Sequence, residues 1–303
     1  MKYDCIIVGG GIAGLQAAIQ LGRYKHKILV IDSNNGRSNL CHCYHNILGW
    51  PDGVDGQKLR DIGKKQAEGF GVVFIQDEIV DAKQINEEFS LIGKQGVTYQ
   101  GRLLLLATGV MDRFPYFSNL YPCLGNSIYI CPDCDGYEIN NKRAIVLGSG
   151  DVGANMALTL TYWSQDLVYV NHEQKKMADR TRKELEKNNI VYAEEPIKKV
   201  VADGSQFKGV KLESGSSIHA DHAFLAFGGN KVRSDLAAML GVDLYNNNHI
   251  LVDPRTKMTN VENVWAAGDV VAHSEQTTIA MGDGMQAAIW MHKYLMGDGP
   301  SEL

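Results

Sequence analysis

Apolar runs alternate with glycine-rich turns along this chain. An apolar run over residues 3–8 ends in glycines, residues 12–21 have helical spacing, and a second apolar run over residues 27–31 ends in Asp32. The order strand, glycine-rich turn, helix, strand and acid is that of a βαβ unit. The first third of the chain is therefore expected to open with such a unit.

The same order returns in the middle of the chain. A strand is predicted over residues 143–147, a glycine-rich turn over 148–153, a helix over 154–161 and a strand over 167–170. A second βαβ unit is expected to begin here.

Two linkers delimit this second unit. Pro115 disfavours regular structure in the segment 112–115, and a strand over 223–227 ends in Gly228 and Gly229. Further strands over 101–108 and 263–267 and a helix over 277–295 are predicted outside the linkers. These features predict an α/β fold of two Rossmann-like dinucleotide-binding domains, each a three-layer ββα arrangement, with the second inserted into the first. The predicted first domain comprises residues 1–112 and 231–303, and the second comprises residues 113–230.

Length, charge and cysteine content narrow the function classes. A chain of 303 residues accommodates two domains, and its net charge of −5 gives no electrostatic reason to bind nucleic acid. No apolar stretch approaches the roughly 20 residues that a membrane helix requires. Six cysteines in a chain of this size are not typical of a secreted disulfide scaffold, so we expect a cytoplasmic protein without a membrane partner.

The first glycine-rich turn, Gly9 to Gly14, fits the pattern G-x-G-x-x-G. Gly9 would allow the tight turn, Gly11 would let the backbone approach a pyrophosphate, and Gly14 would let the helix pack on the strand. The pyrophosphate would lie at the helix N-terminus, and Asp32 would bind the adenosine ribose hydroxyls.

An acid near the other end of the chain is expected at the same site. Gly268 and Asp269 follow a predicted strand and precede a long helix, a position that suits contact with a polyol and a phosphate. The alternative is that Asp269 is only a turn or helix-capping acid.

The second turn repeats the pattern with Gly148, Gly150 and Gly153. Two such sites in one chain suggest a flavin that stays bound and a nicotinamide that binds and leaves. The alternative is a degenerate second site that keeps its fold without its ligand.

Cys131 and Cys134 form a C-x-x-C pair followed by Asp135. Two thiols at this spacing can close a disulfide, and the adjacent carboxyl can exchange a proton with a thiolate. The alternative is half of a zinc site, but no second C-x-x-C or H-x-x-H follows at zinc-finger spacing. We therefore expect a redox-active pair and no metal.

With these motifs, the sequence resembles the low-molecular-weight thioredoxin reductases of the FAD-dependent pyridine nucleotide-disulfide oxidoreductase family. The resemblance is carried by segments in chain order: the Gly9–Gly14 turn, His45 to Gly49, Ala107 to Gly109, Cys131 to Gly136, the Gly148–Gly153 turn, Trp265 to Asp269, and Gln276. It implies FAD, a nicotinamide donor and a homodimer. It also implies that Cys134 lies against the flavin, that Cys131 attacks the partner disulfide, and that Asp135 is the acid.

The resemblance assigns ligand-binding groups throughout the chain. The flavin group comprises Gly9, Gly11, Ala13, Gly14, Asp32, Asn46, Ala107, Thr108, Gly109, Gly268, Asp269 and Gln276. The nicotinamide group comprises Gly148, Gly150, Asp151, Val152, Gly153 and Glu173.

The sequence departs from the family after the second strand of the inserted domain. His172 and Glu173 stand where thioredoxin reductases usually carry two arginines that hold the 2′-phosphate of NADPH. A carboxylate favours a free ribose hydroxyl and repels a phosphate, so we expect NADH in preference to NADPH. Compensation by nearby lysines would instead permit NADPH.

The residues between the two thiols, Pro132 and Asp133, also differ from the usual Ala-Thr. They are similar to those of a branch that includes dithiol oxidases, so the expected partner is either a thioredoxin-like protein or a small disulfide or dithiol. Two other functions stay open: a dithiol oxidase or ferredoxin-fed reductase with a degenerate nicotinamide site, and a non-catalytic flavoprotein sensor.

Four further residues of metal-ligating types lie close together in sequence: Cys41, His42, Cys43 and His45. They could bind a metal, supply an auxiliary thiol or pack around the flavin. We expect packing, because adjacent residues rarely ligate one metal together.

Overall fold

The computed structural model describes residues 2–297; residue 1 and residues 298–303, the two ends of the predicted first domain, lie outside the described part. The chain forms two compact units. The first comprises Met1–Asn39, Gln57–Met111 and Lys231–Leu303, and the second comprises Leu40–Gly56 and Asp112–Asn230.

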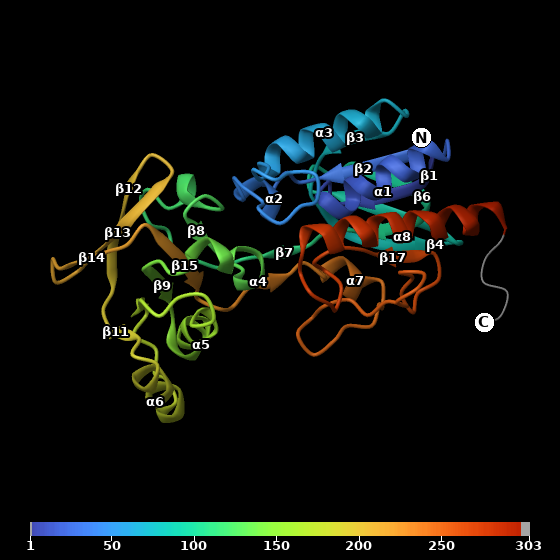
Figure 1. The fold of residues 1–303 in the computed structure, drawn as a ribbon. Coiled ribbons are helices and arrows are strands. Elements are labelled where there is room, and N and C mark those ends of the chain that lie inside the picture. The colour runs from blue at the N-terminus through green and yellow to red at the C-terminus, as the bar shows by residue number, and fades with distance from the viewer. Residues whose placement is uncertain (1, 298–303) are drawn as a thin grey trace. The chain divides into compact units, whose positions relative to one another are not determined.

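A seven-stranded sheet forms the centre of the first unit (Figure 1). Its strands are β1 (Lys2–Val8), β2 (Ile28–Asp32), β3 (Val73–Gln76), β4 (Ile79–Ile85), β5 (Glu88–Gly93), β6 (Thr98–Leu106) and β17 (Val264–Ala266). The order is β3-β2-β1-β6-β5-β4, with β17 pairing to the C-terminal end of β6. The pairs among β3, β2, β1, β6 and β17 are parallel, whereas β4, β5 and β6 are antiparallel.

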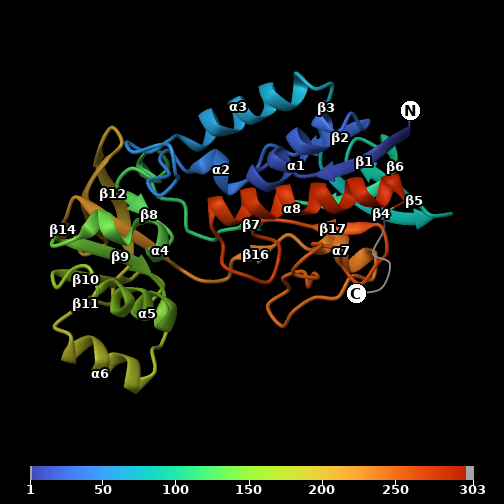
Figure 2. The same cartoon turned by 45° about the vertical axis from the view of Figure 1, so that its right-hand side comes forward.

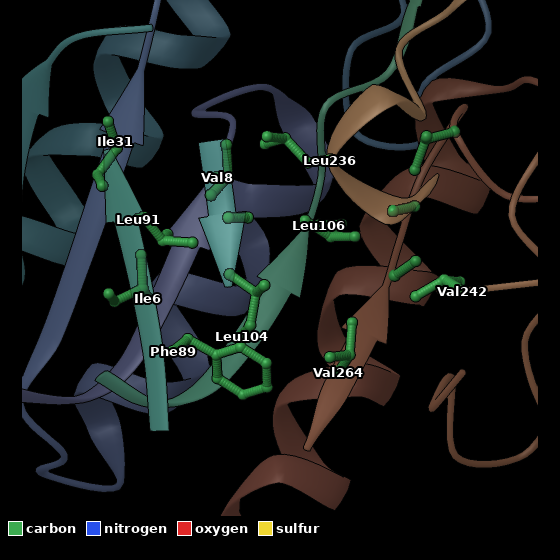
Figure 3. Close-up of a cluster of buried hydrophobic side chains, with 14 of the residues drawn as sticks. Ile6, Val8, Ile31, Phe89, Leu91, Leu104, Leu106, Leu236, Val242 and Val264 are labelled. Carbon is green, nitrogen blue, oxygen red and sulfur yellow. The ribbon is translucent and has the colours of Figure 1, made fainter. Parts of the chain in front are cut away.

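Both faces of the parallel strands are buried. On one face, Cys5 and Ile7 pack with the helices α1 (Ile12–Arg23) and α8 (Thr277–Met296), which lie side by side (Figures 1 and 2). On the other face, Ile6 and Val8 pack with Phe89 of β5 and with the segment after residue 235 (Figure 3). Burial on both faces explains why the strands read as continuous apolar runs.

The remaining elements of the first unit are short or peripheral. They are α2 (Arg37–Leu40), α3 (Gly56–Glu68), β7 (Val110–Met111), β16 (Lys231–Val232) and α7 (Asp235–Met239). The last residue of α2 and the first residue of α3 already belong to the second unit. The strands β7 and β16 pair antiparallel. The long segment Asp112–Asn230 therefore leaves the first unit and returns to it at two adjacent strands.

A parallel five-stranded sheet forms the centre of the second unit, in the order β11-β10-β9-β15-β8 (Figure 2). The strands are β8 (Ile128–Tyr129), β9 (Ala144–Gly148), β10 (Leu167–Asn171), β11 (Val191–Ala193) and β15 (His222–Ala226). The helices α5 (Gly150–Leu160) and α6 (Asp179–Lys187) contribute to the core on one face, and the antiparallel strands β12 (Ile197–Asp203) and β13 (Gln206–Leu212) contribute to the core on the other. A third antiparallel strand, β14 (Ser217–His219), pairs with β13. The turns of helix η1 (Tyr121–Cys123), α4 (Pro132–Asp135) and η2 (Gly136–Ile139) complete the unit.

The predicted fold class is confirmed, because both units have the parallel sheet and covering layers of a Rossmann-like fold and the second interrupts the first. The predicted strands and helices around both glycine-rich turns are also present. On α8, Ala287 and Trp290 are buried, whereas the Ile279 side chain is exposed. No helix among residues 2–297 is both long and apolar enough to cross a membrane.

The segment Leu40–Gly56 corrects the predicted continuity of residues 1–112, because it packs with the second unit. Leu40 contacts the core cluster of that unit, and the His42 N–H donates to the Leu124 carbonyl at 3.1 Å. Gly125 has a φ of +78°, and a Cβ there would lie 2.8 Å from the His42 nitrogen, so this close contact requires a glycine. Local periodicity could not reveal such a long-range contact.

Candidate functional site

Strand register gathers the predicted flavin-binding segments at one edge of the first sheet. Val8 pairs with Ile31 and with Leu106, and Leu106 pairs with Ala266. Because these strands are parallel, the segments that follow their carboxyl ends emerge together, and ligands of such sheets bind at this edge. The segments are the Gly9 turn, Asp32, residues 107–109, and Gly268 with Asp269.

The first glycine-rich turn leaves an open space at the N-terminus of α1. Gly9 has a φ of +106°, and a Cβ there would lie 2.2 Å from the Ala107 carbonyl oxygen. A Cβ on Gly14 would lie 1.9 Å from the Gly9 carbonyl oxygen. At Gly11, by contrast, no described atom beyond its two neighbours in the chain lies within 4 Å of a Cβ position. This turn fits a pyrophosphate, because its backbone is closely packed except where a phosphate would approach.

Asp32 is held by an arginine that the sequence analysis did not single out. Arg60, on α3, donates to Asp32 Oδ2 at 2.7 Å, to Asn34 Oδ1 at 3.0 Å and to the Gly10 carbonyl at 2.9 Å. The Arg60 side chain is buried, and its Nε has no hydrogen-bond partner among the described residues. In sequence, Arg60 looks like one more charge on a polar helix, and only the fold places it beside the turn.

Gly268 and Asp269, two further members of the predicted flavin group, lie at the same edge. Gly268 has a φ of +80°, and its N–H donates to Asp283 Oδ2 at 3.2 Å. Asp269 accepts from Arg37 at 3.0 Å. A Cβ on Gly268 would lie 2.8 Å from the Ala13 Cβ, so the two segments are in close contact.

Residues 107–109 and the start of α8 supply the other predicted members of this group. Ala107 is buried, the Thr108 hydroxyl donates to the Arg233 carbonyl at 2.6 Å, and Gly109 has a φ of +68°. Gln276 is the N-cap residue of α8. Asn46 is the exception: it is exposed on the segment Leu40–Gly56 and thus belongs to the second unit.

The second glycine-rich turn lies at the corresponding edge of the second sheet. Asn171, Gly148 and Ala226 occupy one row of the register at the ends of β10, β9 and β15. A Cβ on Gly148 would lie 2.6 Å from the Ala226 carbonyl oxygen, and a Cβ on Gly153 would lie 2.4 Å from the Tyr169 ring. The close backbone packing of the first turn is therefore repeated here.

Gly150, the middle glycine of this turn, faces the protein's own chain. It has a φ of +52°, and a Cβ there would lie 3.2 Å from the Lys175 Cβ. Its N–H donates to Asn171 Oδ1 at 3.0 Å, and the Asn171 amide group donates to the Lys175 carbonyl at 2.8 Å and to the Tyr192 hydroxyl at 3.1 Å. Asn171 thus ties the loop after β10 to the turn.

The other predicted nicotinamide-binding residues surround this loop. Asp151 accepts from the Ala178 N–H at 3.1 Å, and the Val152 side chain is exposed. Glu173 accepts two hydrogen bonds from Arg113, at 2.9 and 3.0 Å, and forms an ion pair with Lys175 at 2.9 Å. The hydrogen bonds from Arg113 hold the pKa of Glu173 well below its usual range. Arg113 was not predicted, because it lies in a linker far from Glu173 in sequence.

The two thiols of the C-x-x-C pair lie at the start of α4 in the second unit. Cys131 is the N-cap residue, and its Sγ accepts a hydrogen bond from the Cys134 N–H at 3.3 Å. Hydrogen bonding from the Cys134 side chain, together with this N–H, lowers the pKa of Cys131 despite partial burial. A lowered pKa increases the thiolate fraction, which is the reactive form.

Asp135 lies next to the pair and contacts His45. The two side chains are 3.2 Å apart, between His45 Nδ1 and Asp135 Oδ1. Burial raises the pKa of Asp135, although the hydrogen bond to His45 opposes that rise. The same hydrogen bond raises the pKa of His45. The pair can therefore hold a proton near the thiols at higher pH than an exposed carboxyl could.

The neighbouring thiols Cys41 and Cys43 differ from the C-x-x-C pair. Burial raises the pKa of Cys41 to about 12, and burial also raises the pKa of Cys43. Both are therefore expected to stay protonated near neutral pH, which disfavours an auxiliary nucleophile. Among the described residues, no group of three or more His, Cys, Asp or Glu side chains is arranged to hold a metal ion.

Comparison with known proteins agrees with this arrangement. The family model described as pyridine nucleotide-disulphide oxidoreductase matches residues 3–284. A thioredoxin reductase from Aquifex aeolicus is 27% identical over 305 residues, which cover 97% of this chain and 94% of the relative. A thioredoxin reductase from Treponema pallidum is 29% identical and covers 94% of this chain and 95% of its own length.

Solved structures give the same result. The crystal structure of HlmI superposes with a TM-score of 0.86 at 27% identity and covers 98% of this chain and 93% of HlmI. A protein described as a thioredoxin reductase, TrxB, from Bacillus anthracis superposes with a TM-score of 0.84 at 26% identity, with coverage of 98% and 99%.

Proposed function

This chain belongs to the pyridine nucleotide-disulphide oxidoreductase family, and from this premise we propose that it carries electrons from a nicotinamide through FAD to the Cys131–Cys134 pair and on to a disulfide. Membership of the family makes the chain an FAD-dependent disulfide oxidoreductase resembling thioredoxin reductase. The observation that carries the electron path is the joint presence of Cys131, Cys134 and Asp135 at the start of α4. This complete set also argues against a non-catalytic sensor, which would not need all three residues.

We assign FAD to the first unit and the nicotinamide to the second. The open turn at Gly11, the carboxylate of Asp32 and the acid at Asp269 fit the pyrophosphate, the adenosine ribose and the ribityl chain. When bound, FAD would supply two-electron transfer between a nicotinamide and a disulfide. Asn46 and Gln276, assigned to flavin by resemblance, stay part of this proposal.

The chain's own residues perform the thiol chemistry in this proposal. The Cys131 thiolate attacks one sulfur of the substrate disulfide, which forms a mixed disulfide and releases one substrate thiolate. Asp135 donates the proton that this leaving thiolate takes up, and His45 positions Asp135. The Cys134 thiolate then attacks Cys131 Sγ, which closes the Cys131–Cys134 disulfide and releases the second substrate thiolate.

NADH is the favoured donor, because Glu173 presents an acceptor suited to ribose hydroxyls. Two hydrogen bonds from Arg113 fix the position of this carboxylate, and its lowered pKa keeps it ionised. An ionised carboxylate disfavours the 2′-phosphate of NADPH.

The test is to add NADH or NADPH anaerobically to the oxidised, flavin-loaded protein and follow the visible flavin absorbance. Rapid bleaching by NADH and slow bleaching by NADPH would support the proposal. A Cys134→Ser variant is the matched control: its flavin should still bleach with NADH, but electrons should not reach a disulfide substrate. Bleaching by neither nucleotide would reject a nicotinamide donor.

One observation favours a second candidate function, a dithiol oxidase or a ferredoxin-fed reductase with a degenerate nicotinamide site. A Cβ at Gly150 would lie 3.2 Å from the Lys175 Cβ, so the following loop crowds the second glycine-rich turn. Anaerobic bleaching by a small dithiol or reduced ferredoxin, but not by NADH, would establish this alternative.

The partner and assembly also remain proposals. The substrate is a thioredoxin-like protein or a small disulfide, and the expected assembly is a homodimer in the cytoplasm. Size-exclusion chromatography with light scattering would test the dimer, and turnover with thioredoxin compared with small disulfides would identify the substrate class.

A further inference from the structure

The contact between Arg113 and Glu173 spans the edge of the second sheet. Glu173 lies two residues after β10, whereas Arg113 lies in the segment that enters the unit after β7. Arg113 Nη1 donates to Glu173 Oε1 at 2.9 Å, and Nη2 donates to Oε2 at 3.0 Å. A guanidinium also binds a phosphate through two parallel hydrogen bonds of this kind.

Further hydrogen bonds fix Arg113 against the end of β15. Its Nε donates to the Gly228 carbonyl at 2.9 Å, and Nη2 also donates to the Phe227 carbonyl at 3.2 Å. Its backbone N–H donates to Asn230 Oδ1 at 3.1 Å. These hydrogen bonds hold the Arg113 guanidinium at the sheet edge where nucleotides bind in such folds, whichever acceptor its two Nη groups contact.

Charge determines what this guanidinium can bind. Arg113 and Lys175 both pair with Glu173, so the three side chains carry a net charge of +1, from two positive charges and one negative charge. While Glu173 is ionised, it occupies both guanidinium donors of Arg113 and would face a bound nucleotide as an acceptor. Without that carboxylate, the same guanidinium and Lys175 would offer two positive charges to a phosphate.

We propose that Arg113 and Glu173 together determine nucleotide specificity: Arg113 holds Glu173 as the acceptor for a ribose 2′-hydroxyl and would itself bind a 2′-phosphate if Glu173 were neutral. This inference rests on the proposed nicotinamide site in the second unit. Arg113, from the linker, would thus take the place of the family's arginine pair, and its guanidinium is paired with the Glu173 carboxylate.

The test measures binding of NAD⁺ and NADP⁺ to the oxidised, flavin-loaded protein by calorimetry, so that no turnover is needed. The wild type should bind NAD⁺ more tightly. Glu173→Gln should shift the ratio of the two dissociation constants toward NADP⁺ by roughly tenfold or more. Adding Arg113→Gln to Glu173→Gln should abolish that gain, whereas adding Arg113→Lys should restore only part of it, because lysine cannot form the two-bond contact.

Lys176→Gln is the matched control, since Lys176 is an exposed cation of the same loop. Combined with Glu173→Gln, Lys176→Gln should leave most of the gain in NADP⁺ affinity intact. If the Lys176→Gln and Arg113→Gln double variants lost that gain equally, the effect would be one of general charge, and the role of Arg113 would be overturned. An unchanged ratio in Glu173→Gln, in a protein whose flavin NADH still bleaches, would overturn this inference alone. Absence of binding and of bleaching in every variant would overturn both this inference and the nicotinamide donor.

Discussion

The two glycine-rich turns share one spacing and one position at a sheet edge, yet they differ in what faces the middle glycine. At Gly11 no described atom beyond the two neighbouring residues lies within 4 Å of a Cβ position, whereas at Gly150 the Lys175 Cβ would lie 3.2 Å away. The motif therefore specifies how strand and helix pack. It does not specify whether the phosphate position is open.

The residue that ends the second strand also differs between the two turns. Asn171 can accept from the Gly150 N–H and donate to the Lys175 carbonyl at once, so it pulls the following loop onto the turn. Asp32, at the same place in the first unit, has only acceptor oxygens when ionised, and it accepts from Arg60 instead. An amide thus accompanies the crowded turn and a carboxylate accompanies the open one.

The largest expected effect breaks the open turn. Gly11→Val should lower flavin affinity by at least about 100-fold, because a side chain would enter the space that a pyrophosphate requires and displace its charge-assisted hydrogen bonds. The backbone at Gly11, with φ −75° and ψ −170°, accepts a β-branched residue. The measurement is the ratio of visible flavin absorbance to protein. The unfolding free energy of the flavin-free variant should match that of the wild type, and a full complement of flavin would contradict an open phosphate position.

Converting the second turn to the first is the next test. Asn171→Asp should lower the free energy of unfolding by about 3 kcal/mol, because a buried carboxylate cannot donate to Lys175 or Tyr192. The released loop should also be cleaved faster by trypsin at Lys175 and Lys176. Tyr192→Phe, which removes only one of these bonds, is the control and should have a smaller effect. Equal trypsin rates in wild type and Asn171→Asp would show that Asn171 does not hold the loop.

A smaller effect probes the crowding at Gly150. Gly150→Ala should lower the free energy of unfolding by about 2 kcal/mol, from the positive φ and the contact with Lys175, and should leave flavin content unchanged. Gly204→Ala is the matched control, since Gly204 has a φ of +57° with no described atom within 4 Å of a Cβ. Gly204→Ala should lower the free energy of unfolding only through the positive φ, by about 1 kcal/mol. Equal losses, measured by urea unfolding, would mean that Lys175 does not crowd Gly150.

The smallest effect lies outside both turns. His45→Gln should leave NAD⁺ and flavin binding unchanged but shift the pH dependence of disulfide reduction. The hydrogen bond to His45 opposes the raised pKa of Asp135, so its loss should raise that pKa further. Asp135 would then keep its proton to higher pH, and the alkaline limb of the profile should move to higher pH. His42→Gln is the control, since the His42 imidazole lies 3.5 Å from Asp55; a profile that shifts equally in both variants, or in neither, would reject a positioning role for His45.

Much of this architecture follows from sequence alone, because its signals are local. The strands before and after each turn are buried on both faces, so Cys5 to Val8 and Ala144 to Gly148 read as unbroken apolar runs. Close backbone contacts leave no room for a side chain at Gly9, Gly14, Gly148 or Gly153, so both motifs stand out as glycines. The spacing of Cys131 and Cys134 is likewise fixed by one turn of helix.

Tertiary structure decided what those local signals could not carry. Arg60 reaches Asp32, Arg113 reaches Glu173 and His45 reaches Asp135 across long stretches of chain. Arg60 and Arg113 look like ordinary charged residues in sequence, and nothing there pairs His45 with Asp135. Each role depends on a neighbour that only the folded chain brings within hydrogen-bonding distance. The same reason explains the segment Leu40–Gly56, whose contacts with Leu124 and Gly125 place it in the second unit although its sequence neighbours belong to the first.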